Sequence, residues 1–468
     1  MYRPSCGSLV LLSFNKKGFP STPERTYAAY ACESSPKSNP IKTRSVLDAS
    51  SNPVCTGNHV NIPASRDKPS SIIHTRILHH DSDNCTRGIL NAVSPIYSMV
   101  NDISALKQVP RLFFKDNAMP LQLIFFVTNK CNARCSHCFY WDELNNPAKK
   151  ELTLEEVQKM SKSMGEMLIL YLGGGEPFLR RDLPEIAQTF YENNNTRLVG
   201  IPTNAFLPEI MLPSIDRMCT LCPNANILIN VSIDDIGIAH EQFRVVPGGW
   251  EKLLRTIAGI KELKKKHKNL ALGCNATFNS KNQDKIKEIY YYLRDEIKPD
   301  SININLVRGK PKDPHCSDID IAKYNEVIGI LQTDLAKADL GYTTSSFQNI
   351  INQNQIRTKE LISQTYQDKK AFVTCTASRL IGVLYPDGEL FPCELLDSKY
   401  RIGNIRETDY DFKKLWFSER NKEIAKWIVD TKCFCTHECF MSTNTMFSPK
   451  EVIGTVLTAV TRPIKNIK

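Results

Sequence analysis

Three cysteines on one short loop are the residues of this chain best suited to chemistry. Cys131, Cys135 and Cys138 stand in the segment Val-Thr-Asn-Lys-Cys-Asn-Ala-Arg-Cys-Ser-His-Cys-Phe-Tyr-Trp. Three thiolates can bind three irons of an iron–sulfur cube and leave the fourth iron open for a substrate or cofactor, whereas four would close the cluster for electron transfer. The alternative is a zinc loop or chance cysteines. Zinc sites usually pair two halves with two-residue gaps, and this triplet has no such partner nearby.

The loop resembles the signature of the radical SAM enzymes. The resemblance implies a [4Fe–4S] cluster whose open iron binds the amino and carboxylate groups of S-adenosylmethionine and whose electron produces a 5′-deoxyadenosyl radical. In this family the residue before the third cysteine is usually aromatic. Here it is His137, whose imidazole can stack on adenine. The resemblance implies no catalytic residue beyond the cluster ligands.

Further segments resemble the cofactor pocket of the same family. In its Gly-Gly-Glu-Pro motif, the glycines let the backbone approach the methionine end of the cofactor and the acceptors receive its ammonium. The family's fourth-strand edge lies near the ribose, although here Asp235 replaces a glycine, and a following arginine can pair with the methionyl carboxylate. Alternatives are an ordinary strand–helix turn and a surface arginine. The residues assigned to the pocket are His137, Gly174, Gly175, Glu176, Pro177, Thr203, Asn204, Ser232, Asp234 and Arg244.

A second group of cysteines follows a predicted hairpin with the turn Pro386-Asp-Gly388. This arrangement resembles the auxiliary-cluster extension called SPASM, or its shorter form called twitch, and the five cysteines suffice for one auxiliary [4Fe–4S] cluster. A structural zinc at the same thiols is the alternative. His437 lies between two candidate ligands, and we expect it to face solvent. The predicted ligands are Cys375, Cys393, Cys435 and Cys439, with Cys433 as the alternate.

The elements that must position these residues follow a regular pattern from Leu121 onward. Short apolar runs alternate with amphipathic segments, which predicts strand–helix units and a parallel sheet. Thr153 and Glu156 form a capping box that predicts a helix start. In parallel barrels the working residues lie after the strands, as the motifs here do. We predict an α/β fold, a partial (β/α)6 TIM-like barrel followed by a small cysteine-rich domain with a β-hairpin. The predicted strands are 121–127, 167–172, 198–201, 227–233, 271–278 and 301–307.

Length and composition predict several segments. With 468 residues and 41% hydrophobic residues, the chain is long enough for two or three domains. We expect a disordered or targeting extension over 1–95, a lead-in over 96–120, the radical SAM core over 121–315 and a helical connector over 316–372. The auxiliary domain follows over 373–441, and a C-terminal tail over 442–468. Sixteen cysteines without a recognisable secretory signal favour a reducing compartment. We therefore expect a cytoplasmic protein, with organelle targeting as the alternative.

The expected partners follow from charge and from the resemblance. The net charge of +10 is modest for this length, and the run Lys264 to Lys268 has no interleaved aromatic residues, which argues against nucleic acid. No apolar stretch reaches the roughly 18 to 20 residues that cross a bilayer, so we expect no integral membrane association. The resemblance implies a flavodoxin- or ferredoxin-type electron donor. It also implies hydrogen-atom abstraction from a peptide or protein side chain, with small-molecule cofactor biosynthesis as the alternative. A non-enzymatic iron–sulfur or zinc scaffold, or an electron carrier, is the alternative from another class.

Overall fold

The computed structural model describes residues 118–337 and 346–461. Its core is a parallel sheet in which each strand pairs with the next along the chain, so that the strand order is also the sequence order. All six predicted strands are present, displaced by at most two residues at either end. They are β1 (Gln122–Thr128), β2 (Ile169–Gly174), β3 (Leu198–Thr203), β4 (Asn226–Ser232), β5 (Leu270–Phe278) and β6 (Ser301–Leu306). The predicted partial barrel is therefore confirmed.

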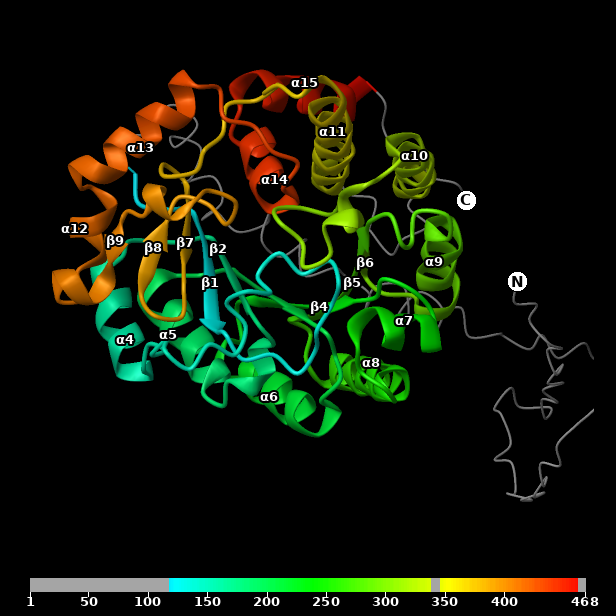
Figure 1. Ribbon diagram of the computed structural model, residues 1–468, viewed down its shortest axis with the longest axis horizontal. Helices are drawn as coiled ribbons and strands as arrows, with labels where there is room; N and C mark the ends of the chain where they lie inside the picture. The colour runs from blue at the N-terminus through cyan, green and yellow to red at the C-terminus, as the bar shows by residue number, and fades with distance from the viewer. Residues whose placement is uncertain (1–117, 338–345, 462–468) are drawn as a thin grey trace, which may run out of the picture. The chain divides into compact units, whose positions relative to one another are not determined.

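Amphipathic helices connect these strands and cover the outer side of the sheet (Figure 1). The first of them begins at the predicted capping box, where the Glu156 amide donates to Thr153 Oγ1 (3.2 Å) and the Thr153 amide donates to Glu156 Oε2 (2.8 Å). Val157 and Met160 on its inner face are fully buried. The outer helices are α4 (Leu154–Ser163), α5 (Leu183–Asn194), α6 (Pro208–Leu221), α7 (Ile238–Arg244), α8 (Gly249–Lys266) and α9 (Ile286–Tyr292).

The hairpin of the second cysteine region continues the same sheet. Strand β7 (Ile381–Leu384) pairs in parallel with β1, and β8 (Glu389–Phe391) and β9 (Gly403–Asn404) follow it in antiparallel. The result is one nine-stranded sheet in the order β6-β5-β4-β3-β2-β1-β7-β8-β9. The sequence predicted the hairpin but not its pairing with β1. The cysteine-rich region is therefore joined to the barrel through backbone hydrogen bonds.

Within the described residues, six more α-helices follow the barrel strands. The predicted connector contains two of them. Helix α14 begins inside the second cysteine region, and α15 follows that region. The segment predicted as a tail from residue 442 consists mainly of helix in its described part, and Arg357 Nε of α11 lies 2.7 Å from Glu451 Oε2 of α15. These helices are α10 (Ile321–Lys337), α11 (Ser346–Asp368), α12 (Phe412–Trp416), α13 (Glu419–Asp430), α14 (Glu438–Met446) and α15 (Pro449–Thr461).

Some predictions lie outside the described residues. The extension over 1–95 and nearly all of the lead-in over 96–120 belong to this part of the chain. Within residues 118–337 and 346–461, no helix is both long and apolar enough to span a membrane.

Candidate functional site

The three cysteines of the loop after β1 are half-buried and lie among other predicted site residues. The loop turns at the second thiol, where the Cys138 amide donates to the Cys135 carbonyl (3.2 Å). Burial raises the pKa of Cys131 to about 12 and that of Cys138 to about 11, and it also raises the pKa of Cys135. Such thiols stay protonated until a cation binds, because metal binding requires the thiolate. A metal ion that binds to this loop must therefore displace the protons of the three thiols.

The glycine motif closes against the base of this loop. The Gly175 amide donates to the Thr128 carbonyl (2.9 Å), and the Glu176 amide donates to the Lys130 carbonyl (2.8 Å). Gly174 has φ +121°, and a Cβ there would lie 2.2 Å from the Thr128 oxygen. A Cβ at Gly175 would lie 2.1 Å from the Lys130 oxygen. Only glycine allows this approach, which fixes the end of β2 beside the cysteine loop.

Glu176 connects the ends of β2 and β3. Its buried carboxylate accepts from Thr203 Oγ1 (2.8 Å), from the Asn204 amide (2.8 Å) and from the Phe178 amide (3.3 Å). Burial raises its pKa to about 6, and these hydrogen bonds limit the rise. Asn204 Nδ2 in turn donates to Asn132 Oδ1 within the cysteine loop (2.7 Å). The predicted pocket residues of β2 and β3 therefore form one hydrogen-bonded group with the loop.

Asp234 and Arg244 form a buried ion pair next to the second thiol. Arg244 Nε and Nη2 donate to Asp234 Oδ2 at 2.9 and 2.5 Å. Burial alone would raise the pKa of Asp234, but the Arg244 guanidinium holds it at about 2. The positive charge of Arg244 also counteracts the effect of burial on the pKa of Cys135. The predicted partner of Arg244 was a carboxylate of the cofactor, whereas in the structure its partner is Asp234.

His137 lies inside this group. Its ring stacks on Phe243, with centroids 4.8 Å apart and planes 18° apart, and its Nε2 lies 3.9 Å from Asp234 Oδ2. Burial lowers its pKa to about 4, so the imidazole is neutral near pH 7. Phe243 thus occupies one face of the ring that we predicted to stack on adenine. Ser232 is half-buried at the end of β4, on the same strand edge as Asp234.

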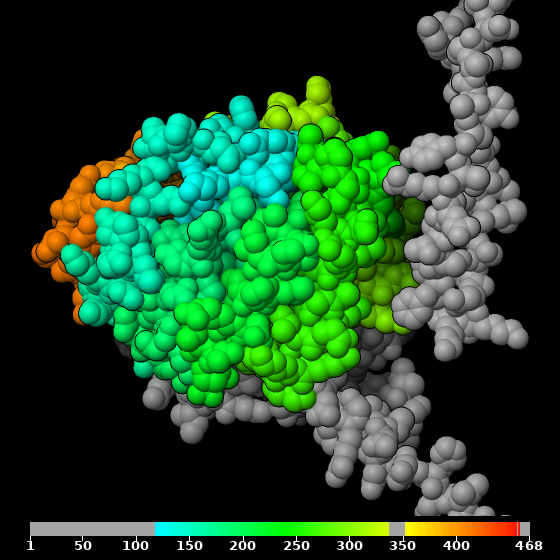
Figure 2. Space-filling view, turned by 90° about the horizontal axis from the view of Figure 1, so that it is seen from below, coloured from blue at the N-terminus to red at the C-terminus, as the bar shows by residue number. Residues whose placement is uncertain are grey.

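The segment after β1 reaches the surface on one side of the molecule. In Figure 2 the segment after β1, in cyan, forms a continuous surface with the green segments that follow β3 and β4. The Arg134 amide of the loop donates to the Arg244 carbonyl at the end of α7 (3.0 Å). The predicted site residues from four strands are therefore assembled in one place.

The second group of cysteines surrounds a cavity of about 150 Å³. Four thiols line it, those of Cys375, Cys393, Cys433 and Cys435, together with apolar side chains such as Phe440. Cys439 is also largely buried but lies at the start of α14, where the charges of Arg308 and Glu394 act on its thiol. The cavity therefore contains the predicted alternate, Cys433, in place of the predicted ligand Cys439. Among the described residues, no three Cys, His, Asp or Glu side chains converge as they would around a single metal ion.

His437 differs from our expectation because it is completely buried. Its Nε2 lies 2.5 Å from Glu394 Oε2, and Glu394 also lies 3.4 Å from Arg308 Nη2. The Arg308 guanidinium stacks over Phe139, 4.8 Å from the ring centroid, beside the first cysteine loop. Sequence reasoning missed the role of Glu394, although its position directly after Cys393 was a usable signal. This chain of contacts joins the two thiol groups.

The remaining cysteines of the core are structural. Cys219, Cys222 and Cys274 are buried in the hydrophobic core. Asn269 Nδ2 donates to the carbonyls of Cys219 and Cys222, which ties the end of α6 to β5.

Comparisons with known proteins agree with this geometry. The family model "Radical SAM superfamily" matches residues 125–289, and the model "Iron-sulfur cluster-binding domain", SPASM, matches residues 375–440. The chain is 28% identical to the pre-heme d1 synthase of Dinoroseobacter shibae over 37% of this chain and 40% of that protein. It is 26% identical to the AdoMet-dependent heme synthase of Methanosarcina barkeri over 66% of this chain and 85% of that protein.

The similar proteins also include one named for bacteriocin biosynthesis and one whose solved structure contains a bound peptide. The chain is 23% identical to the antilisterial bacteriocin subtilosin biosynthesis protein AlbA of Bacillus subtilis, over 67% of this chain and 65% of that protein. The solved structure of anSMEcpe with bound AdoMet and Cp18Cys peptide is 18% identical, covers 75% of this chain and all of its own, and has a TM-score of 0.48. By the two family models, the chain belongs to the radical SAM superfamily and carries a C-terminal SPASM iron–sulfur cluster-binding domain.

Proposed function

We propose that this protein reductively cleaves S-adenosylmethionine and abstracts a hydrogen atom from a peptide or protein side chain. A [4Fe–4S] cluster bound by three cysteines supplies the electron that converts S-adenosylmethionine into methionine and a 5′-deoxyadenosyl radical. The observation that carries the proposal is the assembly of three half-buried cysteines of one loop with Glu176 and Arg244 from two other chain segments. This donor set fits the cluster because it provides three thiolates and no fourth.

The surrounding residues have distinct parts in this proposal. Gly174 and Gly175 let the end of β2 approach the backbone of the cysteine loop, and Glu176, whose carboxylate is already oriented by Thr203 and Asn204, would hold the ammonium. Arg244, although paired with Asp234, lies close enough to Cys135 for its charge to favour the thiolate form of that side chain.

The charges inside the barrel favour a peptide over a highly anionic small molecule. Tetrapyrroles, the compounds that heme-synthase relatives act on by name, carry several carboxylates and need cations to bind them. In this chain Arg244 pairs with Asp234, Arg308 with Glu394, and Lys359 Nζ with Glu438 Oε1 at 2.8 Å. Each of these cations is already neutralised. Small-molecule cofactor biosynthesis is the second candidate. It is favoured by the similarity to the AdoMet-dependent heme synthase, which extends over 85% of that protein.

We further propose one auxiliary [4Fe–4S] cluster in the cavity of the SPASM domain. Four thiols around a cavity of about 150 Å³ suit a cluster of several atoms. The sulfur ligands of a single zinc ion would instead lie only about 2.3 Å from the metal. Its role would be to accept an electron from the substrate radical or to bind the substrate. A flavodoxin- or ferredoxin-type donor would supply the initial electron.

The test is anaerobic reconstitution with iron and sulfide, followed by S-adenosylmethionine and dithionite. We expect 5′-deoxyadenosine, measured by liquid chromatography, in amounts that exceed the protein. Protein with a verified full iron content that forms none would contradict the proposal and favour an electron carrier or scaffold. Electron-resonance spectra that do not change when S-adenosylmethionine is added would do the same.

A further inference from the structure

Helix α15 buries polar side chains and exposes apolar ones. Glu451 and Thr455, which lie one turn apart, are only 5% and 7% exposed. Ile453 and Leu457, also one turn apart, are 61% and 60% exposed. A surface helix of a globular protein usually shows the opposite pattern, with its apolar side chains against the core. The outward side of α15 therefore offers apolar surface that the fold of this chain does not bury.

An ion pair fixes which side of α15 points outward. Arg357 Nε of α11 donates to Glu451 Oε2 at 2.7 Å, and Arg357 Nη1 lies 3.1 Å from Glu360 Oε2. The Glu451 side chain is only 6% exposed, so this pair is largely shielded from water. In Figure 1 α15 lies along α11 and α14 at the edge of the molecule. The exposure of Ile453 and Leu457 thus follows from the way the helix is anchored.

The exposed side chains of α15 form one continuous face. Lys450, Ile453, Gly454 and Leu457 are spaced by three and four residues, so they lie on the same side of the helix. A Cβ at Gly454 would meet no atom from outside its own helix, among the described residues, within 4 Å. Isolated exposed apolar residues are ordinary on protein surfaces, whereas neighbouring ones indicate a contact surface. We call these four residues the exposed face of α15.

The charged residues at this end of the chain are all basic. After Glu451 no Asp or Glu follows up to Lys468, whereas Arg462, Lys465 and Lys468 do follow, and the exposed face adds Lys450. Apolar side chains beside several cations and no acids are typical of helices that lie on the surface of an anionic bilayer. The 13 residues of α15 are too few to cross a bilayer, which takes about 20.

We propose that α15 and the basic residues after it dock onto the surface of an anionic phospholipid bilayer. In this arrangement Ile453 and Leu457 enter the boundary between headgroups and acyl chains, and the basic side chains lie among the phosphates. A protein partner is less favoured, because a stable protein interface buries about 800 Å² on each partner. Two apolar side chains provide much less area, but together with several cations they suffice for reversible binding to lipid.

The test is co-sedimentation of the reconstituted full chain with lipid vesicles. One set of vesicles consists of phosphatidylcholine, and the other of equal parts of phosphatidylcholine and phosphatidylglycerol, which is anionic. We expect at least tenfold more protein on the anionic vesicles, and release at high salt, because salt screens the charges. No binding to either set, or equal binding to both, would overturn the proposal. The measurement uses no S-adenosylmethionine, so its outcome is independent of the proposed function.

Variants of exposed residues test which surface binds the vesicles. Ile453→Gln should lower binding to the anionic vesicles at least fivefold, and Gly454→Leu should raise it at least threefold by enlarging the apolar area. The matched control is Ile210→Gln, because Ile210 is 48% exposed on α6, on the opposite side of the molecule in Figure 1. Sedimentation without vesicles corrects for aggregation. Unchanged binding of the Ile453 variant, or an equal loss in the control, would contradict the proposal.

Two further measurements test the charges and the competing occupant. Lys465→Glu combined with Lys468→Glu should reduce binding to the anionic vesicles to the level seen with phosphatidylcholine alone, and unchanged binding would count against the proposal. Analytical ultracentrifugation without lipid should show the same oligomeric state for the wild type and for Ile453→Gln. A wild-type dimer that this variant dissociates would assign the exposed face of α15 to a second copy of the chain and overturn its assignment to lipid.

Discussion

The two thiol groups of this protein are built in opposite ways. Cys131, Cys135 and Cys138 belong to one loop that follows one strand. The four thiols of the auxiliary cavity come from three segments, around residues 375, 393 and 433–435, and two of these segments flank the β7–β8 hairpin, whose strand β7 pairs with β1. The spacing within one loop is enough to bring its three cysteines together. The four cysteines of the auxiliary cavity are far apart in the sequence, and only the assembled sheet brings them together. The first group is therefore readable from sequence, and the second requires the fold.

The largest expected effect is a difference in activity between variants of the two thiol groups. Cys135→Ala should abolish formation of 5′-deoxyadenosine, because the cluster with the open iron loses a ligand. Cys393→Ala should keep uncoupled cleavage of S-adenosylmethionine and lose product turnover. Both are measured by chromatography on reconstituted protein with matched iron content. If the two variants behaved alike, the proposed division of labour would be wrong.

The next prediction sharpens the ligand set of the auxiliary cavity. Cys433→Ala should lower the iron content from about eight toward four atoms per chain, because Cys433 lines the cavity. Cys439→Ala is the matched control, since Cys439 is buried at the start of α14, where Arg308 and Glu394 act on it. Iron analysis and Mössbauer spectra measure the outcome. A greater loss of iron in the Cys439 variant would restore the set predicted from sequence.

The first group also depends on the buried pair of Asp234 and Arg244. Asp234→Ala leaves the guanidinium without its carboxylate in a buried place, which should lower the free energy of unfolding by about 3 kcal/mol. The control is Asp216→Ala, whose surface pair with Lys266 should contribute less than about 1 kcal/mol. Urea unfolding followed by circular dichroism compares the two. Equal losses in the free energy of unfolding would mean that the pair of Asp234 and Arg244 does not stabilise the fold more than a surface pair does.

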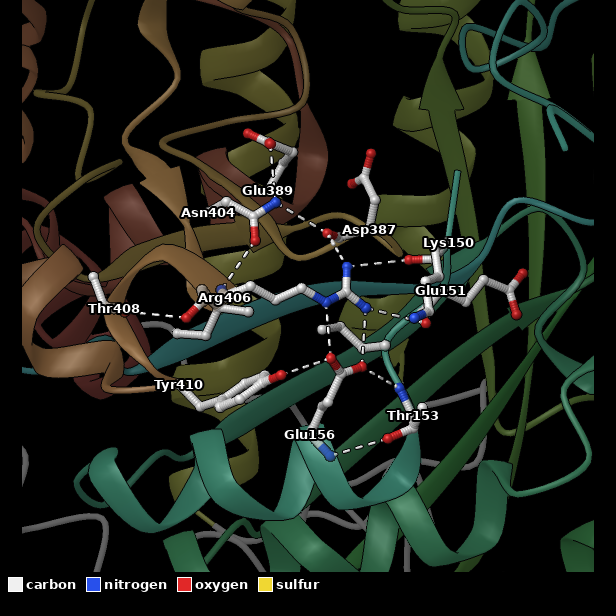
Figure 3. A network of polar contacts seen from close by, with 12 residues as sticks. Lys150, Glu151, Thr153, Glu156, Asp387, Glu389, Asn404, Arg406, Thr408 and Tyr410 are labelled. Atoms are coloured by element: carbon white, nitrogen blue, oxygen red, sulfur yellow. Dashed lines mark hydrogen bonds and ion pairs between the residues drawn. The ribbon is translucent and has the colours of Figure 1, made fainter. Parts of the chain in front are cut away.

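The auxiliary region is tied to the barrel by a more exposed pair, shown in Figure 3. Arg406 Nε and Nη2 donate to Glu156 Oε1 and Oε2 at 2.8 and 2.9 Å, and Tyr410 Oη donates to Glu156 Oε1 (2.8 Å). Arg406 also donates to the carbonyls of Lys150 and Asp387. One side chain thus joins the start of α4 to the hairpin turn.

This tie should weaken in acid. The hydrogen bond from Arg406 lowers the pKa of Glu156 from 4.5 to about 2. Because the folded pKa lies below the unfolded one, the stabilisation is present above about pH 4.5 and is lost as the pH falls toward 2. Glu156→Gln should reduce stability by about 1–2 kcal/mol at pH 7 and by much less at pH 3. Thermal melts at both pH values measure this, and an equal loss at both would contradict it.

Sequence patterns predicted the parallel strands well because burial of apolar runs is a local signal. The capping box at Thr153 and the strand-end positions of the glycine motif were equally local. The pairing of β7 with β1 was not predictable, since strands of four residues carry no register information. The expectation that His437 faces solvent was wrong, and the ion pair of Arg244 with Asp234 was missed, because Glu394 and Asp234 become neighbours of these residues only through tertiary contacts. Residue spacing identifies candidate ligands, but only the assembled fold shows which polar groups neutralise one another.

The parallel pairing of β7 with β1 has a consequence for any shortened form of the protein. A fragment that ended before residue 373 would leave the amides and carbonyls of β1 uncovered along one side. Such a bare strand invites pairing with other chains. The barrel expressed alone should therefore aggregate, and the catalytic half of the molecule cannot be separated cleanly from the half that binds the additional iron.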